Sequence, residues 1–262
     1  MHKFNNDWLF LREKIDKVSR NKKIIEKINK YFQDYKILSI ADLGCGTGSN
    51  YRYLYPKLKK RQSWDMIDIS FESIKEFKKK TNNKNKIISI NYKKFDLIKN
   101  IKSFKFEKYD IITGSAYLDI MPKNWYLGFK KQNLNTKVIY FSINYDGFFK
   151  FHPKHKDDQY VLNLFNKDQE SDKGIGQKAV GKNCSQIINK LFSKSHKTFV
   201  FDSSWDVSKN KKFQNMFLDF CENVLEKNKI SLDRWLDFRR ENIKKNKSKF
   251  FLRNKDFLAL KL

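Results

Sequence analysis

The sequence lacks the features that would place the protein in a membrane, outside the cell or around a structural metal. No apolar run approaches the ~20 residues that cross a bilayer. Residues 1–7 lead into a charged segment without the apolar core of a signal peptide. The three cysteines, Cys45, Cys184 and Cys221, are widely spaced and match no metal-binding pattern. We therefore expect a cytoplasmic protein with free thiols, no bound metal and no membrane partner.

Acidic residues and arginines are also few. The chain has 29 acidic and 56 basic residues, a net charge of +27, and only eight of the basic residues are arginines. Recognition of bases and phosphates favours the bidentate guanidinium group of arginine. Lysine, asparagine, isoleucine and phenylalanine are abundant and share A/T-rich codons, so genome composition is a sufficient cause of the charge. We predict that most lysines are simply solvated, and a nucleic-acid partner is not favoured, although the basic surface leaves it open.

Residues 37–50, which read I-L-S-I-A-D-L-G-C-G-T-G-S-N, organise the rest of the chain. A short apolar run ends at Asp42 and is followed by Gly44, Gly46 and Gly48, and a helical pattern comes next. This order indicates a buried parallel strand, a tight turn and a helix, which is the nucleotide-binding turn of a doubly wound α/β fold. Glycine suits such a turn because it accepts positive φ and lets a ligand approach the backbone.

Two common nucleotide-binding motifs are missing from this turn. A dinucleotide fingerprint would need a glycine where the chain has Ser49, and a Walker loop would need Gly-Lys-Ser/Thr. The spacing that is present, D-x-G-x-G-x-G, resembles the first motif of class I S-adenosylmethionine (SAM)-dependent methyltransferases. The resemblance implies SAM as the cofactor, methyl transfer as the activity and a doubly wound, mostly parallel seven-stranded sheet. A tight turn without a ligand is the alternative.

Two acids follow later predicted strands. Asp68, which precedes Ile69, ends the second strand ~20 residues after the glycine turn, where an acid accepts hydrogen bonds from ribose hydroxyls. The third predicted strand, about 86–91, is followed by Asp96 and Leu97. The resemblance implies that Asp96 binds the adenine amino group while its apolar neighbours stack on the ring. Taken alone, either acid could instead be a cap or turn residue.

The segment after the fourth predicted strand bears on the methyl acceptor. It reads Gly114-Ser115-Ala116-Tyr117, where methyltransferases acting on amino groups of bases or glutamine have D/N-P-P-Y, and the Pro-Cys motif of C5-cytosine enzymes is absent as well. We therefore expect a small-molecule acceptor. Methylation of RNA or protein, recruited by the basic surface, is the alternative, and a SAM-binding scaffold without activity is a third hypothesis.

The chain outside this core predicts additions to the common fold. Residues 1–34 are expected to form a helical cover, and 35–262 the SAM-binding domain, with a lid insertion at 144–178 and a helical insertion at 207–250. The segments G-T-G-S-N-Y-R-Y-L, S-A-Y-L-D with Trp125 beyond, and N-K-D-Q-E-S-D-K-G-I-G resemble a bacterial group of generically labelled class I methyltransferases. That resemblance implies no particular acceptor.

Candidate catalytic residues lie after the fourth strand and in the predicted lid. We expect the acceptor to lie between Tyr117, Asp119 and the lid residues Tyr145, His152 and His155. His152 and His155 are the candidate bases because histidine titrates near neutral pH, and His152 is the one chosen as catalytic. A surface position is the alternative for either histidine, and some acceptors would need no protein base.

The methionine part of the cofactor also has candidates. Asn50 and Arg52 could bind its carboxylate or merely cap the helix, and Asp42 could order the turn or bind its ammonium group. The sequence does not predict the oligomeric state. The full set of predicted cofactor contacts is Asp42, Gly44, Cys45, Gly46, Gly48, Asn50, Asp68, Ile69, Asp96, Leu97 and Ser115.

Overall fold

The protein is built on one mixed sheet. A computed structural model describes residues 6–70, 75, 86–174 and 176–262. In these residues the strand order is β3-β2-β1-β4-β5-β8-β6, and a short strand, β7, also pairs with β8. The first five strands are parallel, while β8 runs antiparallel between β5 and β6. This confirms the predicted doubly wound fold, with the two-residue β7 added to the seven expected strands. The strands are β1 (Ile37–Leu43), β2 (Arg61–Asp68), β3 (Ile87–Lys94), β4 (Ile111–Ser115), β5 (Val138–His152), β6 (His196–Asp202), β7 (Trp205–Asp206) and β8 (Lys249–Lys261).

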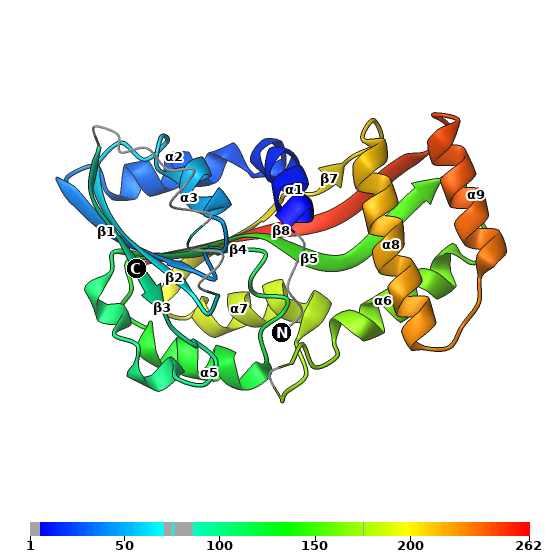
Figure 1. Ribbon diagram of the computed structural model, residues 1–262. Helices are drawn as coiled ribbons and strands as arrows, with labels where there is room; N and C mark the ends of the chain where they lie inside the picture. Colours follow the sequence, from blue (N-terminus) through cyan, green and yellow to red (C-terminus); the bar gives the residue numbers. More distant parts are fainter. Residues whose placement is uncertain (1–5, 71–74, 76–85, 175) are drawn as a thin grey trace.

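Helices cover both faces of the sheet. In Figure 1, α2 and α3 lie on one face of the parallel strands, and α5 and α7 lie on the other. No helix among the described residues is both long and apolar enough to cross a membrane. The helices are α1 (Asn6–Ser19), α2 (Lys22–Tyr31), α3 (Ser49–Leu54), α5 (Lys123–Gln132), α6 (Asp158–Gln169), α7 (Cys184–Phe192), α8 (Lys211–Lys227) and α9 (Asp233–Lys244).

The apolar run of β1 is continuous because the strand is buried on both faces. Leu38 and Ile40 belong to the hydrophobic cluster that includes α2 and α3. Ala41 and Leu43 belong to the opposite cluster, which includes α5 and α7. We refer to β1–β4 with α2, α3 and α5 as the parallel half of the molecule.

The second half of the sheet differs from the sequence prediction. The predicted lid was expected to begin at residue 144, but β5 continues to His152 and pairs with β8 along this whole length. The pairing shifts register between Phe141 and Asn144 and again between Tyr145 and Phe149. The segment around Gly147, which has a positive φ of 78°, resembled a loop in sequence but forms an irregularity within a long strand.

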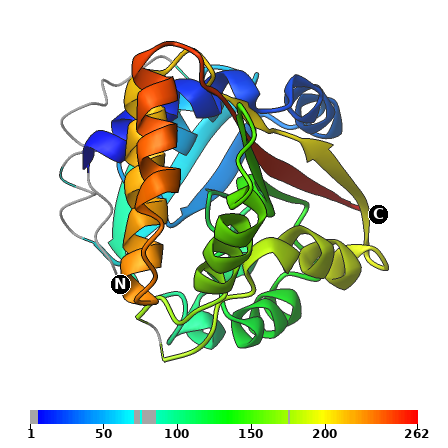
Figure 2. The same cartoon turned by 90° about the vertical axis from the view of Figure 1, so that its right-hand side faces the viewer.

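The extended strands carry a separate hydrophobic core. We call residues 144–152 of β5 and 249–255 of β8 the arm, and the arm with α6, α8 and α9 the arm lobe. Its buried cluster is rich in aromatic residues. Figure 2 looks at this lobe end-on and shows α8 and α9 in front of the arm. Residues 144–169, the first part of the predicted lid, therefore lie in this packed lobe, whereas residues 179–181 lie beside the segment that follows β4.

Candidate active site

The glycine turn leaves open space at one position. Gly44, Gly46 and Gly48 all have positive φ, at 62°, 51° and 84°. A Cβ added at Gly44 would lie 2.5 Å from the ring of Tyr117, whereas one added at Gly46 would meet no atom within 4 Å. The turn is tied to β2 by the Cys45 amide, which donates to the Ile67 carbonyl at 3.0 Å. The backbone at Gly46 is therefore accessible to a ligand, and the space at Gly44 is filled by the protein itself.

Asp68 lies directly against this turn. One carboxylate oxygen accepts the Gly46 amide at 2.8 Å, and the other accepts the Ser70 amide at 2.8 Å. Burial raises the pKa of Asp68 above its ordinary value, and these two hydrogen bonds oppose that shift. The next residue, Ile69, has 42% of its surface exposed, which is unusual for a large apolar side chain. The predicted ribose ligand and its apolar neighbour therefore lie at the edge of the turn.

Asp42 is fully buried below the turn. Its Oδ1 accepts a hydrogen bond from Asn50 Nδ2 at 2.7 Å, and its Oδ2 is buried without a partner. Burial raises the pKa of Asp42 to about 7. An unpartnered carboxylate oxygen is costly to bury, so its retention here points to a ligand that supplies a donor.

Asn50 has a structural role that its sequence position did not reveal. Its amide nitrogen donates to Asp42 and to Thr113 Oγ1 (3.1 Å), and its oxygen accepts from Arg20 Nη1 at 2.6 Å. The other amino group of Arg20 donates to Ser115 Oγ at 2.9 Å. The side chain of Asn50 is thus engaged by the protein on both sides, and it orders Asp42.

Arg20 is a site residue that the sequence analysis missed. It stands between α1 and α2, is 3% exposed, and its guanidinium carbon lies 4.5 Å from the centre of the Tyr53 ring. Two sequence signals could have drawn attention to it. It is one of only eight arginines, and it marks the break between two helical patterns.

Arg52 does not lie free for a cofactor carboxylate. Its guanidinium group makes two 2.7 Å hydrogen bonds to the carboxylate of Glu13 on α1, and Nη1 donates to the Thr47 carbonyl at 2.6 Å. A bidentate ion pair of this kind is among the stronger side-chain contacts. Arg52 therefore holds α1 against the glycine turn. Of its two predicted roles, these contacts favour the structural one over binding of the cofactor carboxylate.

Asp96 lies near Asp68 at the same edge of the sheet. The Phe95 amide donates to the Asp68 carbonyl at 2.9 Å, which joins the end of β3 to the end of β2. One oxygen of Asp96 accepts the amides of Ile98 and Lys99, both at 3.0 Å, and the adjacent Leu97 is buried. The described contacts therefore make Asp96 a turn residue, and they occupy only one of its two oxygens.

Tyr117 forms a wall beside the glycine turn. Its ring lies against Gly44 and stacks on Phe141, with ring centres 6.1 Å apart. Burial, with smaller contributions from the charges of Asp68 and Asp96, raises the pKa of its phenol well above the ordinary value. Tyr117 therefore remains protonated at neutral pH and is unsuited to act as a base.

Asp119 lies two residues further along. Its Oδ1 is buried and has no partner, and burial raises its pKa to about 6, opposed in part by the charges of Arg12 and Lys173. The Asp119 carbonyl accepts the Gly181 amide at 3.0 Å, and the Leu118 amide donates to Asn144 Oδ1 at 3.3 Å. Backbone contacts on both sides thus hold this carboxylate in place.

The structure does not bring the two histidines to this edge. Ser142 of β5 pairs with Ser115 at the end of β4, and the strand then continues from position 142 to 152. At ~3.3 Å per residue, the exposed His152 lies roughly 30 Å further along the strand. His155 contacts Phe238 in the arm lobe. The prediction placed both in a lid because the end of β5, which carries His152 and leads to His155, resembled a loop.

Residues 40–131 match the protein family described as "Methyltransferase domain". The strand order agrees with that match, because the antiparallel strand β8 lies between β5 and β6. Residues 40–131 therefore carry a methyltransferase domain, which supports the class I SAM-dependent type expected from the sequence. The protein is therefore a methyltransferase enzyme that uses SAM as its cofactor.

The methyltransferase also resembles solved structures at low identity. It is 15% identical to the plantazolicin methyltransferase BpumL in complex with SAH, covering 98% of this chain and 88% of that one, with a TM-score of 0.49. It is 10% identical to the cyclopropane synthase MmaA2 from Mycobacterium tuberculosis, covering 90% and 82%, with a TM-score of 0.45. No curated protein matches the chain significantly. Likenesses at this level do not identify an acceptor.

Proposed function

We propose that the enzyme methylates a small molecule through an amine or hydroxyl group, and that Asp119 is the base that removes the proton. The observation that carries this proposal is the buried, unpartnered Oδ1 of Asp119, held by backbone contacts just after β4. A carboxylate in this state can accept a hydrogen bond from an acceptor N–H or O–H. Its raised pKa, about 6, makes it a stronger base than an exposed aspartate.

Residues around the glycine turn fit the three parts of SAM. The unpartnered Oδ2 of Asp42 suits the ammonium group, and the carboxylate of Asp68 suits the ribose hydroxyls. The exposed Ile69 and the free oxygen of Asp96 suit the adenine ring and its amino group. The open space over Gly46 lets the nucleoside lie against the backbone.

SAM supplies an activated methyl group on a positive sulfur. The chain's own residues have three tasks around it, which are to align the acceptor, to exclude water and to take up a proton. Tyr117 forms a wall at the turn, and its neutral phenol adds no charge there. Asp119 takes the proton at Oδ1, and the nearby charges of Arg12 and Lys173 moderate its basicity.

The surroundings of Asp119 favour a small acceptor. The charges of Arg12 of α1 and of Lys173, in the segment that ends at Gly181, both lower the pKa of Asp119. That segment is attached by a bridge between Pro122 and Ala179 and by the Gly181 amide. A group must therefore reach a buried oxygen, which suits a compact molecule better than a folded polymer.

The experiment is methyl transfer from labelled SAM to a fractionated extract by the wild-type enzyme, Asp119→Asn and Asp237→Asn. We expect label in the small-molecule fraction, a loss of about 10²- to 10⁴-fold in kcat for Asp119→Asn, and SAM binding unchanged. Asp237 is exposed on α9 and is the control. The wild-type rate at limiting acceptor should fall about tenfold per pH unit below pH about 6, because Asp119 must be ionised to act. Full activity of Asp119→Asn would exclude it as the base.

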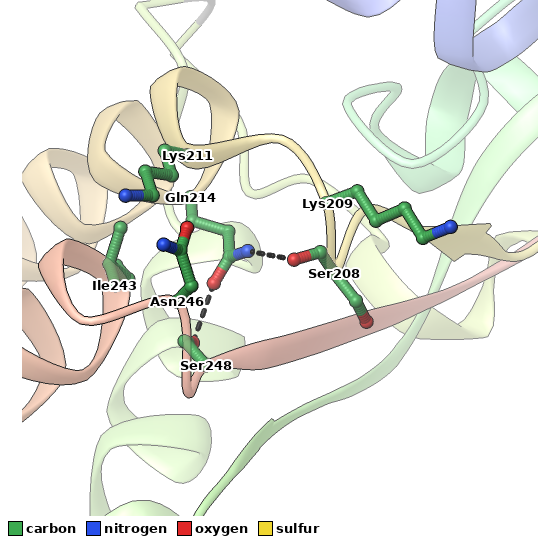
Figure 3. A pocket seen from close by; sticks show the side chains of 7 residues that line it. All are labelled: Ser208, Lys209, Lys211, Gln214, Ile243, Asn246 and Ser248. Carbon is green, nitrogen blue, oxygen red and sulfur yellow. Dashed lines mark hydrogen bonds between the residues drawn. The ribbon is translucent and has the colours of Figure 1, made fainter.

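One observation favours a polymer acceptor as the second candidate. Lys150 pairs with Phe251 across the arm, and its Nζ lies 5.6 Å from the centre of that ring, on the face that also carries Lys249. Adjacent to this face, residues 207–212 and 244–249 contain seven lysines, and the acidic Asp206 pairs with Phe251 on the same face. Figure 3 shows Lys209 and Lys211 extending to opposite sides of a small pocket there, with a volume of about 200 Å³.

A basic face with an accessible aromatic ring is typical of surfaces that bind single-stranded nucleic acid. For a nucleic-acid acceptor, the Michaelis constant should rise steeply with salt because phosphate contacts release counterions. A Michaelis constant that does not depend on salt would exclude this candidate and leave the small molecule.

A further inference from the structure

Arg20 lies outside the matched residues 40–131, yet its charged group lies within the site. It donates to Asn50 at the start of α3 and to Ser115 at the end of β4. Both partners belong to the carboxyl edge of the sheet, where the cofactor turn is. A residue from the N-terminal helices thus joins two neighbouring parts of the cofactor site.

The contact with Asn50 fixes which way that side chain faces. An asparagine amide can be turned over at little cost unless its two ends have different partners. Arg20 can only donate, so the Asn50 oxygen must face it, and the amide nitrogen must face Asp42 and Thr113. Without Arg20, the amide could rotate and place an acceptor beside the Asp42 carboxylate.

The contact also sets the charge below the turn. The positive charge of Arg20 favours the ionised forms of two buried carboxylates, Asp42 and Asp256, while burial opposes both. Asp256 already accepts the amides of Ile143 at 2.8 Å and Asn21 at 3.2 Å. Asp42 has only Asn50 on one oxygen, so the unbalanced negative charge is at its Oδ2.

We infer that Arg20 is a positioning residue that gives the site its affinity for the amino-acid end of SAM. By fixing Asn50, it orients Asp42 so that Oδ2 is free for an ammonium group. This inference rests on the proposed role of Asp42 in cofactor binding. It assigns no contact between Arg20 and the nucleoside part, which the Asp68 and Gly46 side of the turn would hold.

Two ligands separate this role from a merely structural one. SAM carries the amino-acid end, while 5′-methylthioadenosine carries the same nucleoside and a sulfur without it. Calorimetry would give the Kd of each for the wild-type enzyme, Arg20→Gln, Arg20→Lys and Arg240→Gln. Arg240 is an arginine of the arm lobe that pairs with Glu222, and it serves as the control.

We expect Arg20→Gln to weaken SAM binding by about 10- to 100-fold and 5′-methylthioadenosine binding by less than about twofold. Arg20→Lys keeps the charge but not the fork that reaches Asn50 and Ser115, so its loss for SAM should be intermediate. Retained binding of 5′-methylthioadenosine would itself show that the variant site is folded.

Equal losses for both ligands, or no loss for SAM, would overturn the inference. Failure of the wild-type enzyme to bind either ligand would instead contradict the proposed cofactor site. The two failures are therefore distinguishable in one set of titrations.

Discussion

The parallel half and the arm lobe treat buried charge in opposite ways. In the arm lobe, Arg239 is fully buried, forms an ion pair with Asp158, donates to the Pro153 carbonyl and lies over the rings of Phe151 and Trp235. In the parallel half, the fully buried Asp42 keeps one oxygen without a partner. The Arg239 charge is neutralised by a carboxylate, although its Nε has no hydrogen-bond partner, whereas among the described residues the Asp42 carboxylate is hydrogen-bonded only to the neutral Asn50. A buried charge without such a counter-charge is a candidate for binding a ligand. The comparison therefore supports placing the chemistry in the parallel half.

The strands β5 and β8 extend from the sheet beside the parallel half into the arm lobe. β5 pairs with β4 up to Ser142, and from Asn144 onward it pairs with β8 inside the arm. Between them, Ile143 has a φ of 55°, which is rare for a β-branched residue, and its amide is held by Asp256. The strained residue lies where β5 leaves the cofactor edge. The strand therefore passes from the site into the packed arm within a single residue.

The largest expected effect is on the stability of the arm lobe. Phe217 is 2% exposed and packs against Phe149, Phe165 and Phe250, so Phe217→Ala should lower the free energy of unfolding by about 3–5 kcal/mol. Denaturant titration measures this loss, and the Kd for SAM at low temperature should remain unchanged. A large loss of SAM affinity in the folded variant would break the comparison, because the lobe would then shape the cofactor site.

A smaller effect is expected from Asp68 in the parallel half. Asp68→Ala removes a carboxylate that orders Gly46 and Ser70 and that we assign to the ribose, so SAM binding should weaken about 100-fold. Asp206→Ala is the matched control, since Asp206 accepts the Ser208 amide at 3.1 Å in a similar turn on β7. Calorimetry on both variants checks the difference. Equal losses would mean that turn geometry, and not the ligand, accounts for the effect.

The parallel half could be predicted because its determinants are local in sequence. A buried strand followed by glycines specifies a turn, and the acids at the ends of the next strands lie at the same sheet edge by the rules of parallel sheets. This gave β1, the positive-φ glycines and the position of Asp68. The fold class followed from the same pattern.

The rest of the site depends on contacts between distant residues. Arg20 reaches Asn50 and Ser115, which are 30 and 95 positions away, and no local pattern indicates such a network. The arm was missed for a different reason. Gly147 and the nearby acid resembled a loop, although the alternation of Phe149 and Phe151 on the buried face is typical of a strand.

The smallest expected effect concerns His152, the residue that the sequence favoured as the base. It is exposed at the end of the arm, opposite Lys249, and roughly 30 Å along β5 from the cofactor edge. His152→Ala should therefore change kcat by less than about twofold and leave the dependence on pH below 7 unaltered, because we assign that dependence to Asp119. Steady-state kinetics against small-molecule acceptor fractions checks this. A tenfold loss of kcat with unchanged SAM binding would mean that the arm takes part in catalysis, and the division between the two regions would then fail.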